Sequence, residues 1–303
     1  MSNRDHIGRD PSVEEWERLG RRRVLAGFEV FSIELDPIVE LNEPLLVLHG
    51  FPTCSYDYRN VAAELATDRR LLLLDFVGFG LSAKPDVRYS LEMHADVVVE
   101  YVASLGIKSV AMLTHDMGDS VGGELLARNM GGSWPVDVTT RVLTNGSIYL
   151  DLAKLTDGQK LLLALPDEEL QDGPDEAALS ASLAATMAPG KETARGDLLG
   201  DASLIVRGGG NRLLPRTIRY IEDRKRAEGR YTGAIEEHSS PLGVLWGAED
   251  PIAVKEMAAR LARKRPDARV SMLEGVGHYP MLEGPSQFTR LANELLASCR
   301  PPR

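Results

Sequence analysis

The composition of the chain limits the classes of protein to which it can belong. It has 303 residues, 43% hydrophobic and 26% charged, a balance typical of a globular protein with a sizeable core. Its 35 basic and 45 acidic residues give a formal net charge of −10, the wrong sign for binding the phosphates of a nucleic acid. We therefore expect no nucleic-acid partner.

The cysteine content and the apolar segments indicate the cellular compartment in which we expect the protein. Cys54 and Cys299 are too few for a disulfide framework, and neither lies in the spacing of a metal site. Residues 1–23 lack the apolar segment of a secretory signal, and the densest apolar stretch, 71–81, is interrupted by Asp75 and two glycines. We expect a cytoplasmic protein without a membrane span or a metal, and leave open whether it forms a homodimer.

Short apolar runs alternate with amphipathic segments along most of the chain, which indicates an α/β fold. Residues 23–25 and 28–35 predict an opening β-hairpin. Residues 45–49 and 71–75 predict strands buried on both faces of a parallel sheet, with a helix at 58–67 between them. The same pattern then predicts strands at 110–114, 140–143, 243–246 and 269–273, and helices at 90–105, 121–130, 254–264 and 286–297.

One long segment departs from this alternation. Residues 150–238 have helical periodicity but contain no convincing strand, so we expect a helical cap over one end of the sheet. The core would then comprise residues 1–149 and 239–303. Aromatic residues make up only 6% of the chain, and the part of the cap from 150 to 219 contains none.

The segment 113–124 carries a candidate nucleophile in two alternative registers. It contains a G-x-S-x-G sequence at 118–122, which would make Ser120 the nucleophile of a serine hydrolase. Such a nucleophile must directly follow an apolar strand, and this register would place His115 and Asp116 inside that strand. Burying two unpaired ionisable groups in a central strand is costly, which argues against this register.

The other register places Asp116 at the nucleophile position. The strand then ends at Thr114, residues 115–117 form the turn, and Gly118 supplies the small side chain needed where helix and strand approach. Ser120 falls on the first turn of the helix. Asp116 also suits the N-cap of that helix, whose dipole would favour a carboxylate. We predict Asp116, rather than Ser120, as the nucleophile.

Five segments together resemble a known superfamily: HGFP at 49–52, DFVGFGLS at 75–82, HDMG at 115–118, WGAED at 246–250 and GVGHYPMLE at 275–283. Their order and spacing are similar to those of the α/β-hydrolases over about residues 24–288. HDMG resembles the branch with an aspartate nucleophile, which includes epoxide hydrolases, haloalkane dehalogenases and mesoderm-specific transcript proteins. The resemblance implies the α/β-hydrolase fold, with a mostly parallel central sheet flanked by helices and a cap inserted after the sixth strand.

The resemblance also implies the residues that complete the site. An ester formed on Asp116 must be hydrolysed by an activated water, and His278, after the last strand, matches the base of the family. Asp250, after the preceding strand, matches the acid that orients this base, and Glu249 is the alternative. Asn145 stands where some dehalogenases carry the acid, but it has no charge, which favours Asp250.

Two backbone amides are implied as the oxyanion hole. They belong to Met117, which follows the nucleophile, and to Phe51, which follows His49-Gly50. The peptide bond before Pro52 is commonly cis in the family. No cofactor is expected.

The leaving group separates the branches of the family. Dehalogenases hold the halide with an indole N–H beside the nucleophile, together with an asparagine after His-Gly or a second tryptophan in the cap. Here Met117 and Phe51 occupy the first two positions, and the cap contains no tryptophan. Fluoroacetate-type enzymes carry an arginine after the nucleophile, which is also missing. Dehalogenation is therefore disfavoured.

Epoxide hydrolases instead protonate the ring oxygen with cap tyrosines, usually two. Tyr220 matches the second of these, and Tyr149 at the leading edge of the cap could replace the first. The preferred hypothesis is an epoxide hydrolase acting on a small, apolar to moderately polar organic substrate. A haloalkane dehalogenase, an ester or lactone hydrolase using Ser120, and a ligand-binding homologue without catalysis remain as alternatives.

Overall fold

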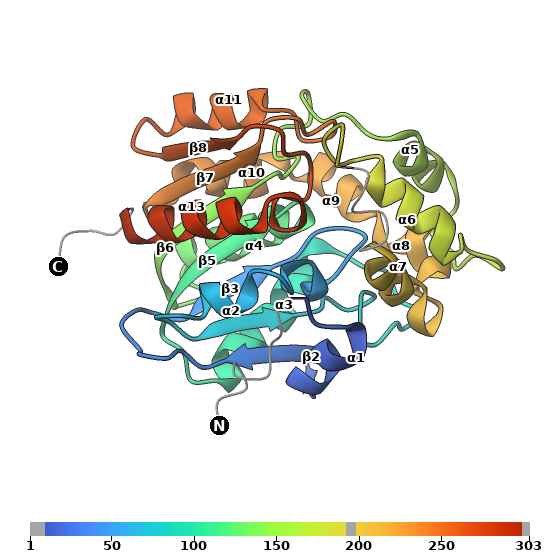
Figure 1. The fold of residues 1–303 in the computed structure, drawn as a ribbon, viewed down its shortest axis with the longest axis horizontal. Coiled ribbons are helices and arrows are strands. Elements are labelled where there is room, and N and C mark those ends of the chain that lie inside the picture. The colour runs from blue at the N-terminus through green and yellow to red at the C-terminus, as the bar shows by residue number, and fades with distance from the viewer. Residues whose placement is uncertain (1–9, 192–197, 299–303) are drawn as a thin grey trace.

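The computed structural model describes residues 10–191 and 198–298, and an eight-stranded sheet forms its centre (Figure 1). Cys299 lies outside these residues. The strands are β1 (Arg21–Leu25), β2 (Phe28–Leu35), β3 (Leu45–Leu48), β4 (Leu71–Leu74), β5 (Ser109–His115), β6 (Asp137–Thr144), β7 (Leu242–Gly247) and β8 (Arg269–Leu273). Their order in the sheet is β1-β2-β4-β3-β5-β6-β7-β8. Strand β2 runs antiparallel to β1 and β4, and the remaining pairs are parallel. The predicted α/β-hydrolase fold and the opening hairpin are confirmed.

Helices cover both faces of this sheet, which explains why β3 and β4 are apolar at every position. The core helices are α1 (Val13–Leu19), α2 (Ala62–Leu65), α3 (Leu91–Ser104), α4 (Met117–Met130), α11 (Glu256–Lys264), α12 (Pro280–Glu283) and α13 (Pro285–Ser298). Helix α4 packs against α3 on one face, and α13 packs against β6, β7 and α2 on the other (Figure 1).

Three of the core helices differ from the sequence prediction. The helix expected at 58–67 is reduced to a 3-10 turn, η2 (Ser55–Tyr58), and the single turn of α2. Helix α1 was not expected; its capping box at Ser12 and its buried Trp16 stabilise it despite its short length. Helix α4 begins at Met117 rather than at 121, directly after Asp116.

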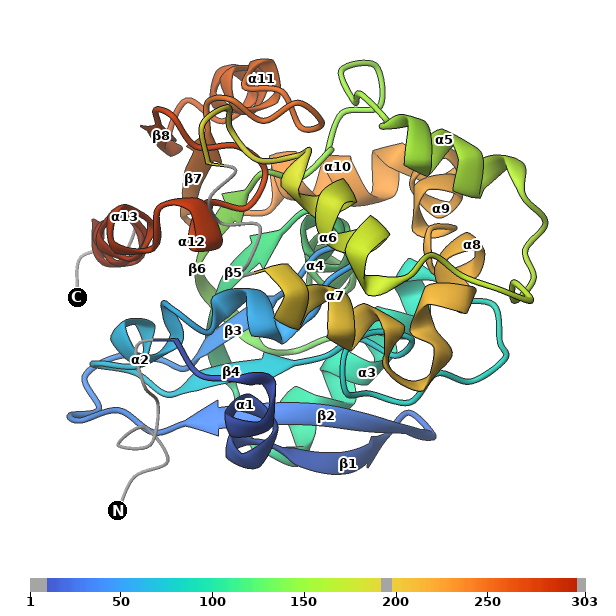
Figure 2. The same ribbon diagram turned by 45° about the vertical axis from the view of Figure 1, so that its right-hand side comes forward.

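The regular elements described between β6 and β7 are all helices, joined by loops, and they lie at one end of the sheet (Figure 2). It contains α5 (Asp157–Ala164), α6 (Glu176–Ala184), α7 (Leu198–Val206), η4 (Arg207–Leu213), α8 (Leu214–Thr217), α9 (Tyr220–Arg226) and α10 (Glu228–Glu237). Helix α10 packs against the core helix α4, and Arg230 on α10 forms an ion pair with Glu124 on α4. The cap boundary at residue 238 stays a prediction, and α10 is the part of the segment with the closest contacts to the core helix α4.

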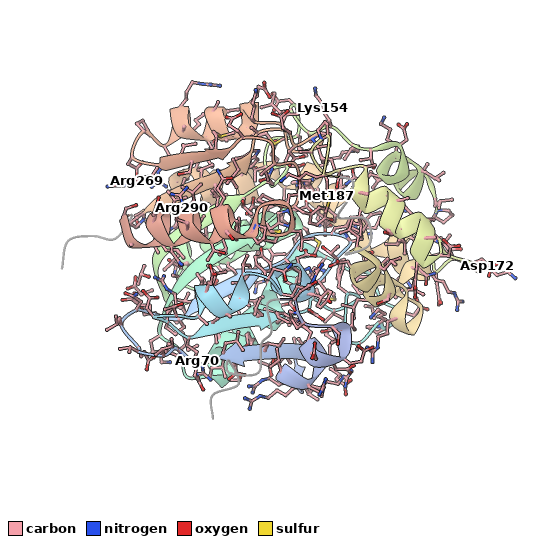
Figure 3. All side chains as sticks on the ribbon, in the orientation of Figure 1. Arg70, Lys154, Asp172, Met187, Arg269 and Arg290 are labelled. Atoms are coloured by element: carbon pink, nitrogen blue, oxygen red, sulfur yellow. The ribbon has the colours of Figure 1, made fainter. Side chains whose placement is uncertain are left out.

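Charged side chains lie at the periphery of the molecule, whereas an apolar side chain lies where the cap meets the core. Asp172, Arg269 and Arg290 are exposed at the periphery, whereas Met187 is buried next to Gly277, where the cap meets the core (Figure 3). No helix among the described residues is both long and apolar enough to cross a bilayer.

Two helical glycines provide a test of the packing at the start of α4. A Cβ at Gly118 would lie 2.5 Å from the carbonyl oxygen of Leu48, whereas a Cβ at Gly233, inside α10, meets nothing within 4 Å. Gly118→Ala should therefore lower the free energy of unfolding by about 1–3 kcal/mol, because backbone must move to admit the methyl group. Gly233→Ala, the control, should raise it by about 0.5–1 kcal/mol through helix propensity. Urea unfolding of both variants measures this, and equal effects would contradict the close approach.

Candidate active site

Asp116 occupies the junction between β5 and α4, where the backbone takes an unusual conformation. Its φ is 49° and its ψ is −113°, a region that residues other than glycine rarely adopt. The side chain is buried, and a Cβ at Gly50 would lie only 2.7 Å from the Cβ of Asp116. A strained residue on a strand-turn-helix connection is the geometry expected for a nucleophile elbow.

The strand before this elbow is one residue longer than predicted. His115 belongs to β5, pairs with Thr144 of β6 and is fully buried. Burial and the neighbouring His278 lower the pKa of His115 to about 4, so the imidazole is neutral at pH 7. The sheet therefore tolerates one of the two ionisable residues, because that residue carries no charge.

The carboxylate of Asp116 contacts the first of the predicted backbone donors. The amide of Phe51 donates a hydrogen bond to Oδ2 of Asp116 at 2.9 Å. The bond between Phe51 and Pro52 is cis, as the resemblance implied. Met117, the other predicted donor, is the first residue of α4 and directly follows Asp116. The amide of Phe51 therefore contacts the carboxylate, and Met117 is the chain neighbour of Asp116.

His278 and Asp250 form a hydrogen-bonded pair. Nδ1 of His278 donates to Oδ2 of Asp250 at 2.8 Å, and the amides of Ile252 and Ala253 donate to Oδ1 of Asp250 at 2.7 and 3.0 Å. The side-chain amide of Asn145 donates to Oδ2 of Asp250 at 2.7 Å. Sequence reasoning considered Asn145 only as a missing acid, whereas the structure shows that it orients the acid. This network fixes the imidazole and leaves its Nε2 for a water molecule.

The loop that carries His278 is fixed from both sides. The amide of His278 donates to the carbonyl of the cap residue Thr186 at 3.1 Å, and its carbonyl accepts from Nε2 of His115 at 2.8 Å. The buried carboxylate of Glu283 accepts from the amide of Gly277 at 2.7 Å. Glu283 was not predicted as a site residue, although it ends the quoted segment 275–283.

The charge of His278 depends on the carboxylates around it. Burial on its own lowers the pKa of His278, but the carboxylates of Asp250, Asp116 and Glu283 outweigh burial and raise it to about 9. The imidazole is therefore protonated at neutral pH. Neutralising Asp116 would remove one of the charges that hold this proton.

Two predicted alternatives are not brought to this site. Glu249 is exposed, so it does not replace Asp250 beside His278. Ser120 is buried inside α4, where its hydroxyl accepts a 3.4 Å hydrogen bond from Arg224. Glu249 therefore does not take the place of the acid beside His278, and Ser120 lies on the helix rather than at the elbow.

Tyr149, predicted as a replacement proton donor, also lies elsewhere. Its hydroxyl donates to Oε1 of Glu236 at 2.8 Å, and the guanidinium of Arg260 covers its ring at 4.2 Å. Neither Tyr149 nor Tyr220 is among the residues that line the cavity described below. The role of Tyr149 as a donor stays a prediction, and in this structure its hydroxyl is bound to Glu236.

Tyr220, the other predicted donor, packs against Phe51, whose amide binds Asp116. It is buried at the start of α9, and its ring centroid is 5.8 Å from that of Phe51. Burial and the nearby carboxylate of Asp116 raise the pKa of Tyr220, while a hydrogen bond and the charge of Arg224 act in the opposite direction. The phenol is therefore protonated and able to donate at neutral pH.

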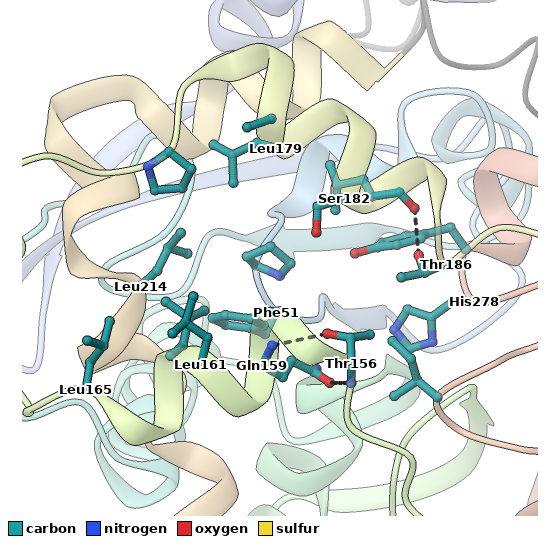
Figure 4. A pocket seen from close by; sticks show the side chains of 18 of the residues that line it. Phe51, Thr156, Gln159, Leu161, Leu165, Leu179, Ser182, Thr186, Leu214 and His278 are labelled. Atoms are coloured by element: carbon teal, nitrogen blue, oxygen red, sulfur yellow. Dashed lines mark hydrogen bonds between the residues drawn. The ribbon is translucent and has the colours of Figure 1, made fainter.

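A cavity of about 320 Å³ lies between the cap and this site (Figure 4). Leucines of α5, α6 and α8 contribute to its wall, among them Leu161, Leu179 and Leu214. Its polar side chains are few: Thr156, Gln159, Ser182, Thr186, His278 and Tyr279. The cavity reaches His278 and Phe51, and the amide of Phe51 binds the carboxylate of Asp116, which is not itself a lining residue. Such a cavity suits an apolar substrate.

Comparison with known proteins identifies the family. The model of the alpha/beta hydrolase fold family matches residues 43–285, and the chain belongs to the α/β-hydrolase superfamily. LipZ of Mycobacterium tuberculosis, a protein named as a hydrolase, is 36% identical over 94% of this chain and 98% of its own length. The mesoderm-specific transcript homolog protein of Homo sapiens is 30% identical over 92% of this chain and 86% of its own.

A solved structure shows the same fold at low sequence identity. The epoxide hydrolase CorEH superimposes with a TM-score of 0.70 at 17% identity, covering 93% of this chain and 99% of its own. Such a likeness concerns the fold alone. Within the described ranges, no cluster of three or more His, Cys, Asp or Glu side chains has the arrangement of a metal site.

Replacing Asp116 by its neutral isostere tests the charge coupling at the site. In Asp116→Asn, the pKa of His278 should fall below its value of about 9, because one of the carboxylates that stabilise the imidazolium is removed. NMR titration of histidine-labelled protein measures this, with His278→Gln used to assign the resonance. An unchanged pKa would show that Asp116 and His278 are not electrostatically coupled.

Proposed function

We propose that this hydrolase opens epoxides through a covalent ester on Asp116. The observation that carries the proposal is the position of the Asp116 carboxylate: it lies on a strained elbow, with Oδ2 bound to the Phe51 amide. Oδ1 then remains to attack a substrate carbon. The hydrogen-bonded pair of His278 and Asp250 supplies the base that activates water for hydrolysis of the resulting ester.

The side-chain donors near the leaving group favour an epoxide substrate over a haloalkane. Met117 and Phe51 offer no side-chain donor to a halide, and the cap offers no indole. Tyr220 provides a protonated hydroxyl near Asp116, which suits an oxygen leaving group that remains attached to the substrate. The name of the structural neighbour CorEH agrees with this reading at the level of the fold.

The first half of the proposed reaction is an alkylation. Oδ1 of Asp116 forms a bond to a ring carbon of the epoxide, and the carbon–oxygen bond breaks with its electron pair moving to oxygen. That oxygen takes the proton of Tyr220. The imidazolium of His278, protonated while Asp116 is charged, then returns a proton to Tyr220. His278 becomes the neutral base required for the second half.

The second half is hydrolysis of the ester. Neutral His278 removes a proton from water, which attacks Cγ of Asp116, and negative charge develops on Oδ2. The amides of Phe51 and Met117 would stabilise this charge; loss of one such donor typically costs about 10²–10³ in rate. Collapse of the tetrahedral intermediate releases the diol and regenerates the Asp116 carboxylate and the His278 imidazolium.

A single turnover in ¹⁸O-water tests this proposal. Water attacks Cγ of Asp116 rather than the substrate, so mass analysis should find the label in the peptide that carries Asp116 and not in the first-turnover diol. Ser120→Ala should give the same labelling. His278→Gln should accumulate the ester, seen as an added substrate mass, because it lacks the base.

The opposite outcomes would reject specific parts of the proposal. Label in the product alone, with activity kept in Asp116→Ala, would rule out the ester. A panel of epoxides, haloalkanes and nitrophenyl esters in the same assay identifies the electrophile. Saturable binding without any turnover would indicate a ligand-binding homologue.

A further inference from the structure

Arg224 is a buried cation beside the proposed proton donor. It lies on α9 one helical turn after Tyr220, so both side chains leave the same face of the helix. Its guanidinium carbon is 5.3 Å from the centroid of the Tyr220 ring, and only 1% of the residue is exposed. Tyr220 and Arg224 therefore form a local unit within the cap, next to Asp116.

Arg224 makes few polar contacts for a buried cation. Its hydrogen bond to the neutral hydroxyl of Ser120 is 3.4 Å long, and its Nε has no partner among the described residues. No ion pair among residues 10–191 and 198–298 includes it. Burial raises the pKa of the neighbouring Asp119 well above its usual range, which disfavours the charged form of that carboxyl. A buried cation of this kind would be stabilised by any anion formed beside it.

The cap contains no second tyrosine at the usual distance along the chain. Residues 150–219 have no aromatic side chain, and Tyr149 is held by Glu236 away from the cavity. In the proposed reaction Tyr220 would therefore lose its proton without help from a second cap tyrosine in this stretch. Tyr279, which lines the cavity, belongs to the His278 loop of the core. The phenolate formed in this step is the anion that Arg224 is placed to stabilise.

We propose that Arg224 is a positioning residue that donates to the hydroxyl oxygen of Tyr220 and stabilises its phenolate during ring opening, in place of a second cap tyrosine. This inference rests on the proposed function. In the step concerned, the proton of Tyr220 moves to the epoxide oxygen as the carbon–oxygen bond breaks, and the negative charge moves to the phenol oxygen beside Arg224. The charge disappears when His278 returns a proton. The hydrogen bond and charge of Arg224 oppose the rise in the pKa of Tyr220, which agrees with this role.

A double-mutant cycle in the His278→Gln background tests the inference, with styrene oxide as the probe and the rate of ester formation on Asp116 as the readout. Arg224→Gln should slow ester formation about 10- to 100-fold, the effect of one hydrogen bond to a charged group. In a Tyr220→Phe background the same substitution should change the rate less than about threefold, because no phenolate forms there. With His278 restored, Arg224→Gln should leave hydrolysis of the ester unchanged.

Arg141 offers a matched control. It is also buried and without an ion pair among the described residues, but it donates to Ser240 and to the carbonyl of His238, away from the site. Arg141→Gln should form the ester at the parent rate. Should Arg224→Gln fail to fold, Arg224→Lys serves in the same cycle; it should show a smaller loss that also disappears with Tyr220→Phe.

Other results would overturn the inference. An undiminished rate in Arg224→Gln, or the same loss with and without the Tyr220 hydroxyl, would show that Arg224 does not act through Tyr220, while ester formation in the parent would keep the proposed function intact. Equal slowing of ester formation and ester hydrolysis would indicate a structural role only. If the His278→Gln parent forms no ester on Asp116, the proposed function fails and this inference fails with it.

Discussion

The site depends on one backbone conformation, the positive φ of Asp116 between β5 and α4. A residue with a side chain adopts it only when its surroundings hold it there. Here two glycines permit the required approach: Gly50 lies against the Cβ of Asp116, and Gly118 lies against the carbonyl oxygens of the strand β3 and its following loop. The turn therefore directs the carboxylate out of the sheet, where the Phe51 amide and His278 meet it.

The charges of the site form a set that changes together during the proposed reaction. In the resting state the carboxylates of Asp116 and Asp250 hold a proton on His278. Ester formation would remove the charge of Asp116 and so favour release of that proton, which makes His278 a base at the stage where one is needed. These three side chains are buried, and burial keeps their interactions strong because bulk solvent does not screen them.

The sequence was sufficient for features that depend on neighbours along the chain. Asp116 could be chosen over Ser120 because burial in a strand penalises charge, and His278 and Asp250 belong to contiguous segments that end predictable strands. The hydrogen bond of Asn145, the position of Tyr149 and the packing of α10 against α4 depend on contacts between residues 87 to 106 positions apart, which no local pattern encodes. Arg224 lies one helical turn after Tyr220 in the sequence. Its burial, and the lack of a hydrogen-bond partner for its Nε, become visible only in the structure.

The most direct test of the account is a crystal structure of His278→Gln after soaking with an epoxide. The account predicts continuous density between Oδ1 of Asp116 and a substrate carbon, with Oδ2 still bound to the Phe51 amide and the new hydroxyl facing Tyr220. Density joining the substrate to Ser120, or an intact epoxide bound away from Asp116 under conditions that support turnover in the parent enzyme, would contradict it.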